Sequence, residues 1–209
     1  MTFIDQLELG VSKISESDPI ITSLASRFGL PTIRPHSDYY QELVSSIISQ
    51  QLSVKAASTI QHRFVALFGT DKIPEPGLIL GKTVEDLRGC GLSRGKAMYI
   101  QDLALHVLDG KIHFDEFTKL SNDEIISELT AVKGIGEWTA HMFLMFCMGR
   151  LDVLAIGDLG LKNGITKLYG LSTQATAEDV RVIALKNKWH PYETIACWYV
   201  WKSLDNSPK

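Results

Sequence analysis

Apolar residues recur at intervals of three and four along most of the chain, which is the spacing of an amphipathic helix. Residues 43–48 carry one such stripe, and a second stripe covers residues 57–68 and stops at Gly69. The intervening residues 50 and 51, both glutamine, interrupt the apolar period. The pattern therefore predicts two helices that are separated by a short polar break.

Helix-start signals support the same interpretation elsewhere in the chain. The pattern Ser/Thr-x-x-acid begins at Thr83, Ser121 and Thr176, where a side-chain oxygen can accept a hydrogen bond from a free N–H of the first turn. Strand-like alternation is confined to residues 151–156, which are too isolated to build a sheet. Three clusters of proline and glycine mark joints between elements: residues 31–35, 73–77 and 157–164. We therefore predict an all-α protein.

The chain has 209 residues, of which 45% are hydrophobic and 22% charged, as in folded globular proteins. This length allows two lobes that share a cleft. We predict a central helical bundle of residues 43–148 and a terminal lobe of residues 1–42 with residues 149–209. The longest strongly apolar stretch, residues 142–148, is far shorter than the roughly 18 to 20 residues that cross a bilayer.

The N-terminus carries acidic residues where a secretory signal would carry basic ones. We therefore expect a protein without membrane association, in the cytoplasm of a bacterium or archaeon or in the nucleus of a eukaryote. We also expect a monomer. The cysteines at positions 90, 147 and 197 include no C-x-x-C pair, so we expect buried thiols with no disulfide, zinc or iron–sulfur site. No metal site is expected.

Net charge does not identify a partner. The chain holds 21 basic and 24 acidic residues, a formal charge of −3, which by itself argues against nucleic acid. Residues 51–100, however, hold 7 basic and 4 acidic residues, enough for one local phosphate-facing surface. Solvated helix faces produce the same fluctuation.

The most specific motif is the string Leu-x-x-x-x-Gly-Ile-Gly-x-Trp-Thr-Ala within residues 129–140. A helix is expected to end there, turn tightly at Gly134 and Gly136, and continue as a new helix, with Ile135 anchored between the two. Glycines leave the turn amides and the positive end of the following helix open to a phosphate. A plain helix–helix connection would use the same glycines. A second glycine-rich turn of similar plan occupies residues 87–97.

The full string resembles the hairpin of the helix-hairpin-helix DNA glycosylases, and within them the DNA-3-methyladenine glycosylase II family. Residues 47–57 are similar to that family's DNA-probing loop, and residues 189–201 to its closing helix. Asp158, which lies 20 positions after Trp138, stands in a Gly-Asp-Leu-Gly-Leu segment like the family's catalytic segment. The resemblance spans about residues 40–202 and implies two helical lobes with the hairpin at the cleft.

The resemblance implies that Asp158 is the catalytic residue of a DNA glycosylase. A carboxylate suits this chemistry because it stabilises the cationic character that develops on the sugar and can orient the attacking water. Taken alone, an aspartate between glycines could equally be a helix cap. Bifunctional relatives carry a Schiff-base lysine where this chain has Trp138, so a monofunctional hydrolase without lyase activity is implied.

The resemblance also implies residues that contact the lesion and the DNA. Gln51 is the best match for a plug that fills the gap left by an extruded base, with Leu52 as a wedge, although a simple solvated turn has the same composition. For the aromatic residues, packing in the core remains the alternative. The expected base pocket comprises Trp138, Trp201, Trp198 and Tyr39. The expected DNA contacts are Gln50, Gln51, Leu52, Ser53, Lys133, Gly134, Ile135, Gly136 and Thr139.

Three positions depart from the family pattern. Lys133 replaces a common proline, Glu137 stands where a basic residue is common, and Glu193 stands where arginine is usual, so the two glutamates could weaken DNA binding. No cofactor is expected, although carbonyls of the hairpin could hold a monovalent cation at the DNA contact.

The implied function is excision of alkylated purines such as 3-methyladenine and 7-methylguanine from double-stranded DNA in base excision repair. Two alternatives stay open: an inactive helix-hairpin-helix DNA-binding protein, and a glycosylase for uncharged lesions such as hypoxanthine. The second alternative needs a group that protonates the leaving base, for which His141 is the nearest candidate in the sequence.

Overall fold

The computed structural model describes residues 1–205, and every regular element in that range is helical. The predicted all-α class is therefore confirmed. None of the helices in this range is long and apolar enough to cross a membrane. The chain divides into two compact units: residues 36–143, called the central unit, and residues 1–35 with the chain from Leu144 onward, called the terminal unit.

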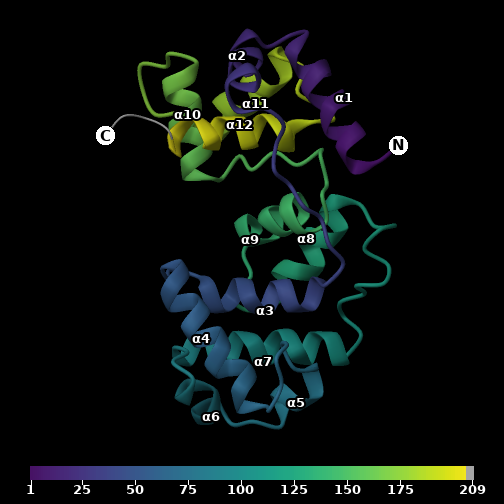
Figure 1. The fold of residues 1–209 in the computed structure, drawn as a ribbon, viewed down its shortest axis with the longest axis vertical. Helices are drawn as coiled ribbons and strands as arrows, with labels where there is room; N and C mark the ends of the chain where they lie inside the picture. The colour runs from purple at the N-terminus through teal and green to yellow at the C-terminus, as the bar shows by residue number, and fades with distance from the viewer. Residues whose placement is uncertain (206–209) are drawn as a thin grey trace. The chain divides into compact units, whose positions relative to one another are not determined.

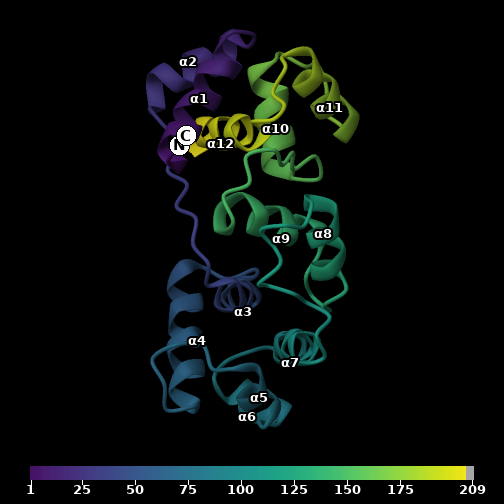
Figure 2. The same ribbon diagram turned by 90° about the vertical axis from the view of Figure 1, so that its right-hand side faces the viewer.

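The central unit is built around α3 and α7, which pack against each other and are both seen nearly end-on in Figure 2. Helix α4 packs on α3, and the short helices α5 and α6 pack on α7. Helices α8 and α9 pack together and are joined by the glycine-rich turn. The helices of this unit are α3 (Tyr39–Ser49), α4 (Val54–Leu67), α5 (Pro76–Leu80), α6 (Val84–Gly89), α7 (Arg94–Leu108), α8 (Asn122–Thr130) and α9 (Glu137–Met142).

The terminal unit combines segments from both ends of the sequence, which appear in purple and in green to yellow in Figure 1. Helix α12 packs against α1, α2 and α10. A π-helical turn, η1 (Phe143–Cys147), directly follows α9, and the division between the units falls inside it. The helices of this unit are α1 (Phe3–Ser15), α2 (Pro19–Phe28), α10 (Leu159–Leu168), α11 (Ala177–Lys186) and α12 (Glu193–Asp205).

A buried aspartate links these distant segments. Asp18 is fully buried, and its side chain caps α2 by accepting hydrogen bonds from the N–H groups of Ile20 and Ile21. The same carboxylate accepts from the Tyr169 hydroxyl at 2.5 Å and from the indole N–H of Trp189 at 2.8 Å. Because burying a carboxyl group is costly unless it is hydrogen-bonded, this network favours packing of the N-terminal segment against the C-terminal segment within the terminal unit.

Local signals located the helix starts correctly. Thr83, Ser121 and Thr176 each cap a helix, and each is paired with an acid three residues later in a complete capping box. The polar break between α3 and α4 is also present, and Gly69 follows the end of α4 in a left-handed conformation with φ of 67°.

Some boundaries differ from the sequence prediction. The units divide at residues 35/36 and 143/144, whereas the predicted lobes meet at 42/43 and 148/149. Residues 157–164 were expected to form a joint, but α10 begins at Leu159 and occupies most of that segment. Burial of Leu161 and Ile165, together with the Asp158 cap, favours a helix there despite its glycines. Residues 151–156 contain no strand.

Candidate functional site

The turn between α8 and α9 has the geometry that the hairpin motif predicts. Gly134 has φ of 85°, and a Cβ atom there would lie 2.1 Å from Cδ2 of Tyr99. The glycine is therefore required by both backbone conformation and packing. Ile135 is buried, as expected for the anchor of the turn.

Gly136 is the N-cap of α9 and has ordinary extended backbone angles, φ −96° and ψ 172°. Apart from the adjoining residues, no heavy atom lies within 4 Å of the position where its Cβ would be, so the approach to the start of α9 is open. The first N–H groups of a helix have no partner inside the helix and carry the positive end of its dipole. The hairpin therefore offers backbone donors to an anion.

Side chains from outside the hairpin hold its shape. The backbone N–H of Lys133 donates to the carboxylate of Asp102 at 2.9 Å, and the Lys133 ammonium lies 3.4 Å from the same carboxylate. The side-chain amide of Gln50 donates to the Gly134 carbonyl at 2.9 Å. Lys133 and Gln50, which the sequence suggested as DNA contacts, thus also have partners within the protein.

The break between α3 and α4, residues 50–53, is called the plug loop. Gln51 has φ of 57°, a left-handed conformation that residues other than glycine seldom adopt. Its side chain is exposed, and Leu52 beside it is 39% exposed. The Ser53 hydroxyl accepts from the Ala56 N–H at 3.3 Å and so caps α4. The loop presents a polar and an apolar side chain next to each other.

Two of the aromatic residues predicted for the base pocket, Trp138 and Tyr39, belong to the central unit and lie in different environments. Trp138, two residues after Gly136, is 52% exposed. Tyr39 instead belongs to an aromatic cluster, with its ring stacked on Phe117 at 5.9 Å between centroids and in edge contact with Phe143. Tyr39 also lines a cavity of about 290 Å³ in this unit. Thr139 is buried.

In the terminal unit, Asp158 is the N-cap of α10. Its Oδ1 atom accepts from the backbone N–H of Leu161 at 2.5 Å and from the indole N–H of Trp201 at 2.7 Å. The carboxylate is therefore held in one orientation by two donors. The helix-cap interpretation of Asp158 is correct, and it does not exclude catalysis, because a cap leaves the negative charge in place.

The contact between Trp201 and Asp158 could not be found from the sequence. Trp201 also lies against Phe146, with 6.0 Å between ring centroids, while Trp198 makes an edge contact with Tyr199. The two residues of the Asp158–Trp201 hydrogen bond are 43 positions apart, and no periodicity joins them. Trp201 was expected as a pocket residue or as part of the core, and neither expectation included a hydrogen bond to Asp158.

Residues 44–190 match the HhH-GPD superfamily of base excision DNA repair proteins. This range includes the plug loop, the hairpin and Asp158, and it covers more than half of the chain. The chain belongs to this superfamily.

Relatives of this HhH-GPD protein cover nearly its whole length. It is 34% identical to the alkylbase DNA glycosidase-like protein mag2 of Schizosaccharomyces pombe over 90% of both chains. The crystal structure of a DNA-3-methyladenine glycosidase from Bacillus halodurans has a TM-score of 0.84 and 38% identity, covering 94% of this chain and 89% of the other. The 3-methyladenine DNA glycosylase of Schizosaccharomyces pombe, solved with abasic DNA, has a TM-score of 0.79 and 32% identity, covering 95% and 97%.

The two glutamates that depart from the family pattern differ in exposure. Glu137, at the start of α9, is largely exposed, so its charge stands beside the open approach to the hairpin. The Glu193 side chain is only 12% exposed and lies 3.0 Å from Nδ1 of His190. Of the two, Glu137 is the one placed to repel a phosphate at the hairpin.

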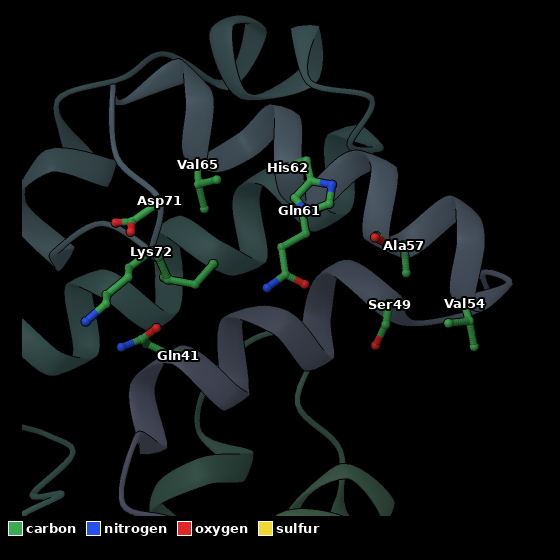
Figure 3. Close-up of a pocket in the computed structure, with 11 residues that line it drawn as sticks. Gln41, Ser49, Val54, Ala57, Gln61, His62, Val65, Asp71 and Lys72 are labelled. Carbon is green, nitrogen blue, oxygen red and sulfur yellow. The ribbon is translucent and has the colours of Figure 1, made fainter.

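The HhH-GPD central unit also holds a cavity of about 500 Å³ between α3, α4 and the segment after α4. Figure 3 shows Gln61 extending from α4 into this space and Gln41 on α3. The residues that line it are Gln41, Ser49, Val54, Ala57, Ser58, Gln61, His62, Val65, Asp71, Lys72 and Ile73. None of the predicted site residues is among them, so this cavity is not the predicted base pocket.

Proposed function

We propose that this HhH-GPD protein is a monofunctional DNA glycosylase that hydrolyses the N-glycosidic bond of alkylated purines, with 3-methyladenine and 7-methylguanine as its principal substrates. The observation that carries the proposal is the Asp158 carboxylate, held by Leu161 and Trp201, in a chain that also has the open hairpin. The relatives named as 3-methyladenine DNA glycosylases support this substrate class.

The chemistry assigned to Asp158 follows from charge. As the bond between base and sugar lengthens, the sugar gains oxocarbenium character, and a carboxylate nearby stabilises that state more than the ground state. The same group accepts the proton of the water that attacks the anomeric carbon. Alkylated purines with a cationic ring depart as neutral bases, so the enzyme does not need to protonate them.

His141 gives a reason to favour cationic substrates over uncharged ones. The ring is buried in α9, and burial lowers its pKa, while the nearby Glu137 carboxylate opposes that shift. A histidine with a lowered pKa is mostly neutral at pH 7 and is a poor proton donor. His141 is therefore unsuited to protonate hypoxanthine as it leaves.

The DNA contacts are assigned to the central unit. Backbone amides at the start of α9 would bind a phosphate, and Gln51 with Leu52 would occupy the space vacated by the extruded base. Trp138 would stack on that base and, lacking an amine, cannot form a Schiff base, so water is the nucleophile. The protein would act as a monomer without a divalent metal.

One assay tests the proposed function directly. The protein is incubated with DNA treated with a methylating agent, and the released bases are identified by mass spectrometry, with and without EDTA. We expect 3-methyladenine and 7-methylguanine in both cases and intact abasic strands. Binding without release would indicate the inactive DNA-binding alternative, and loss of activity in EDTA would refute metal independence. A parallel duplex that contains hypoxanthine tests the uncharged-lesion alternative, which release of hypoxanthine alone would indicate.

Replacing Trp201 with phenylalanine should slow excision by about 10-fold, since a hydrogen bond to a charged group orients that group. Phenylalanine keeps the ring that faces Phe146 but lacks the N–H that donates to Asp158. Single-turnover excision rates measure the effect. In an Asp158→Asn background the same replacement should have a much smaller effect, and an undiminished effect there would show that Trp201 acts independently of Asp158.

A further inference from the structure

One face of α7 supports both segments assigned to DNA contact. Lys96, Tyr99 and Asp102 are spaced by three residues and therefore lie on the same side of the helix. Tyr99 packs beneath Gly134, and Asp102 binds the backbone N–H of Lys133, so both hold the hairpin. Lys96, by contrast, reaches the plug loop.

The Lys96 ammonium donates to two main-chain carbonyls at the end of α3. It lies 2.9 Å from the carbonyl of Ile48 and 2.5 Å from that of Gln50. The last carbonyls of a helix have no partner inside the helix, and a cation there is favoured by the helix dipole. The position is partly buried, and burial lowers the pKa of Lys96.

These bonds fix the residue just before the left-handed Gln51. The Gln50 carbonyl is held by Lys96, and the N–H of Leu52 donates to the Ser49 carbonyl at 3.0 Å on the other side. An uncommon backbone conformation persists only where the surrounding structure determines it. The two anchors therefore determine the direction in which the Gln51 and Leu52 side chains extend.

Gln50 joins the plug loop to the hairpin. Its carbonyl binds Lys96, while its side-chain amide donates to the Gly134 carbonyl. The plug loop is therefore tied to α7 through its main chain and to the hairpin through one side chain. Both connections exist in the protein without DNA.

We propose that Lys96 is a positioning residue that holds the plug loop, before DNA binds, in the conformation that presents Gln51 and Leu52 to the base stack. Lys96 acts through the carbonyls of Ile48 and Gln50 and does not itself contact DNA. This inference rests on the proposed function, because the plug loop is assigned to DNA contact there. Preorganisation of the loop lowers the entropic cost of inserting the plug.

The test compares Lys96→Met, which keeps an unbranched apolar side chain but removes the donors, with Lys119→Met. Lys119 is highly exposed in the same unit and belongs to neither the plug loop nor the turn at residues 133–136, so its replacement controls for the lost charge. Extrusion is followed with a duplex that carries 2-aminopurine beside the lesion. Lys96→Met should lower the extrusion equilibrium and the single-turnover excision rate by about 10-fold or more, because small misplacements near a reacting group have large effects.

Affinity for undamaged duplex should change equally in the two variants. Lys96→Arg, which keeps the charge and several donors, should recover most of the lost extrusion. If Lys96→Met does not fold, Lys96→Gln, whose shorter side chain keeps one donor group, should show a smaller loss in the same direction, and no loss in that variant relative to Lys119→Met would contradict the proposal. The positioning role would be overturned if Lys96→Met extruded the base as well as Lys119→Met does. It would also be overturned if extrusion by Lys96→Met fell only in proportion to its affinity for DNA.

Hydrogen exchange at the Leu52 amide gives a readout that needs neither DNA nor activity. We expect exchange to be at least about 10-fold faster in Lys96→Met than in the wild type, because loss of the anchor opens the loop. Unchanged exchange would refute the positioning role of Lys96. A wild-type protein that excises no alkylated base would instead refute the proposed function, so the two failures are distinguishable.

Discussion

Replacing Asp158 with asparagine should slow base excision at least about 100-fold while leaving DNA affinity within about twofold, because the lost charge acts in the transition state. Asparagine keeps an oxygen that can accept from the Leu161 N–H and the Trp201 indole, and it is a good N-cap. The substitution therefore removes the negative charge with little change in local structure. Single-turnover excision of 7-methylguanine and duplex affinity by fluorescence anisotropy measure the two effects separately.

The loss should be larger for an uncharged lesion than for a cationic one. A cationic base leaves with less assistance, so the stabilisation from Asp158 matters less for 7-methylguanine than for any residual activity on hypoxanthine. Asp152→Asn, which removes the same charge from an exposed position of the terminal unit, serves as the control. If Asp158→Asn excised both substrates at the wild-type rate, Asp158 would only cap α10.

The helices and their caps could be predicted because the signals are local. Capping at Thr83, Ser121 and Thr176 depends on residues at most three positions away, and the structure shows all three caps. The break at residues 50 and 51 was equally visible, because polar residues interrupt a period of three and four. The left-handed conformation of Gln51 was not visible, because neither the residue type nor its neighbours require it.

The contacts that organise the site could not be predicted, because they join residues far apart in the sequence. Gln50 and Gly134 are 84 positions apart, and Lys96 and Gln50 are 46 positions apart. Apolar periodicity reports which face of a helix is buried, but not which polar side chain meets which carbonyl. The sequence predicts a glycine-rich turn at residues 87–97. It does not predict that Lys96 in this segment binds the carbonyls of Ile48 and Gln50, because those contacts depend on tertiary packing.

The error at residues 157–164 has a specific physical cause. Glycine inside a helix is unfavourable by about 1 kcal/mol relative to alanine, so a glycine-rich segment resembles a joint. The Asp158 cap and the burial of Leu161 and Ile165 offset this cost, and α10 forms from Leu159. The start of α10, which the sequence prediction missed, also orients the Asp158 carboxylate.

Replacing Gly136 with aspartate should weaken binding to every duplex by about 100-fold, because juxtaposed like charges are unfavourable by several kcal/mol. The aspartate would place a carboxylate at the start of α9, where the proposed phosphate contact lies. The protein itself should stay folded, since no atom occupies the Cβ position and aspartate is a favoured N-cap. Fluorescence anisotropy over a range of salt concentrations, together with thermal unfolding, tests both expectations.

Gly136→Asn is the matched control, since asparagine adds nearly the same bulk and is an equally good N-cap without the charge. The difference between the two variants then measures the electrostatic part of the loss. Gly134→Ala cannot serve this purpose, because φ of 85° and the 2.1 Å approach to Tyr99 would disturb the hairpin itself. Unchanged affinity of a folded Gly136→Asp protein would remove the hairpin from the DNA interface, whereas equal losses in both variants would mean that bulk rather than charge excludes the phosphate.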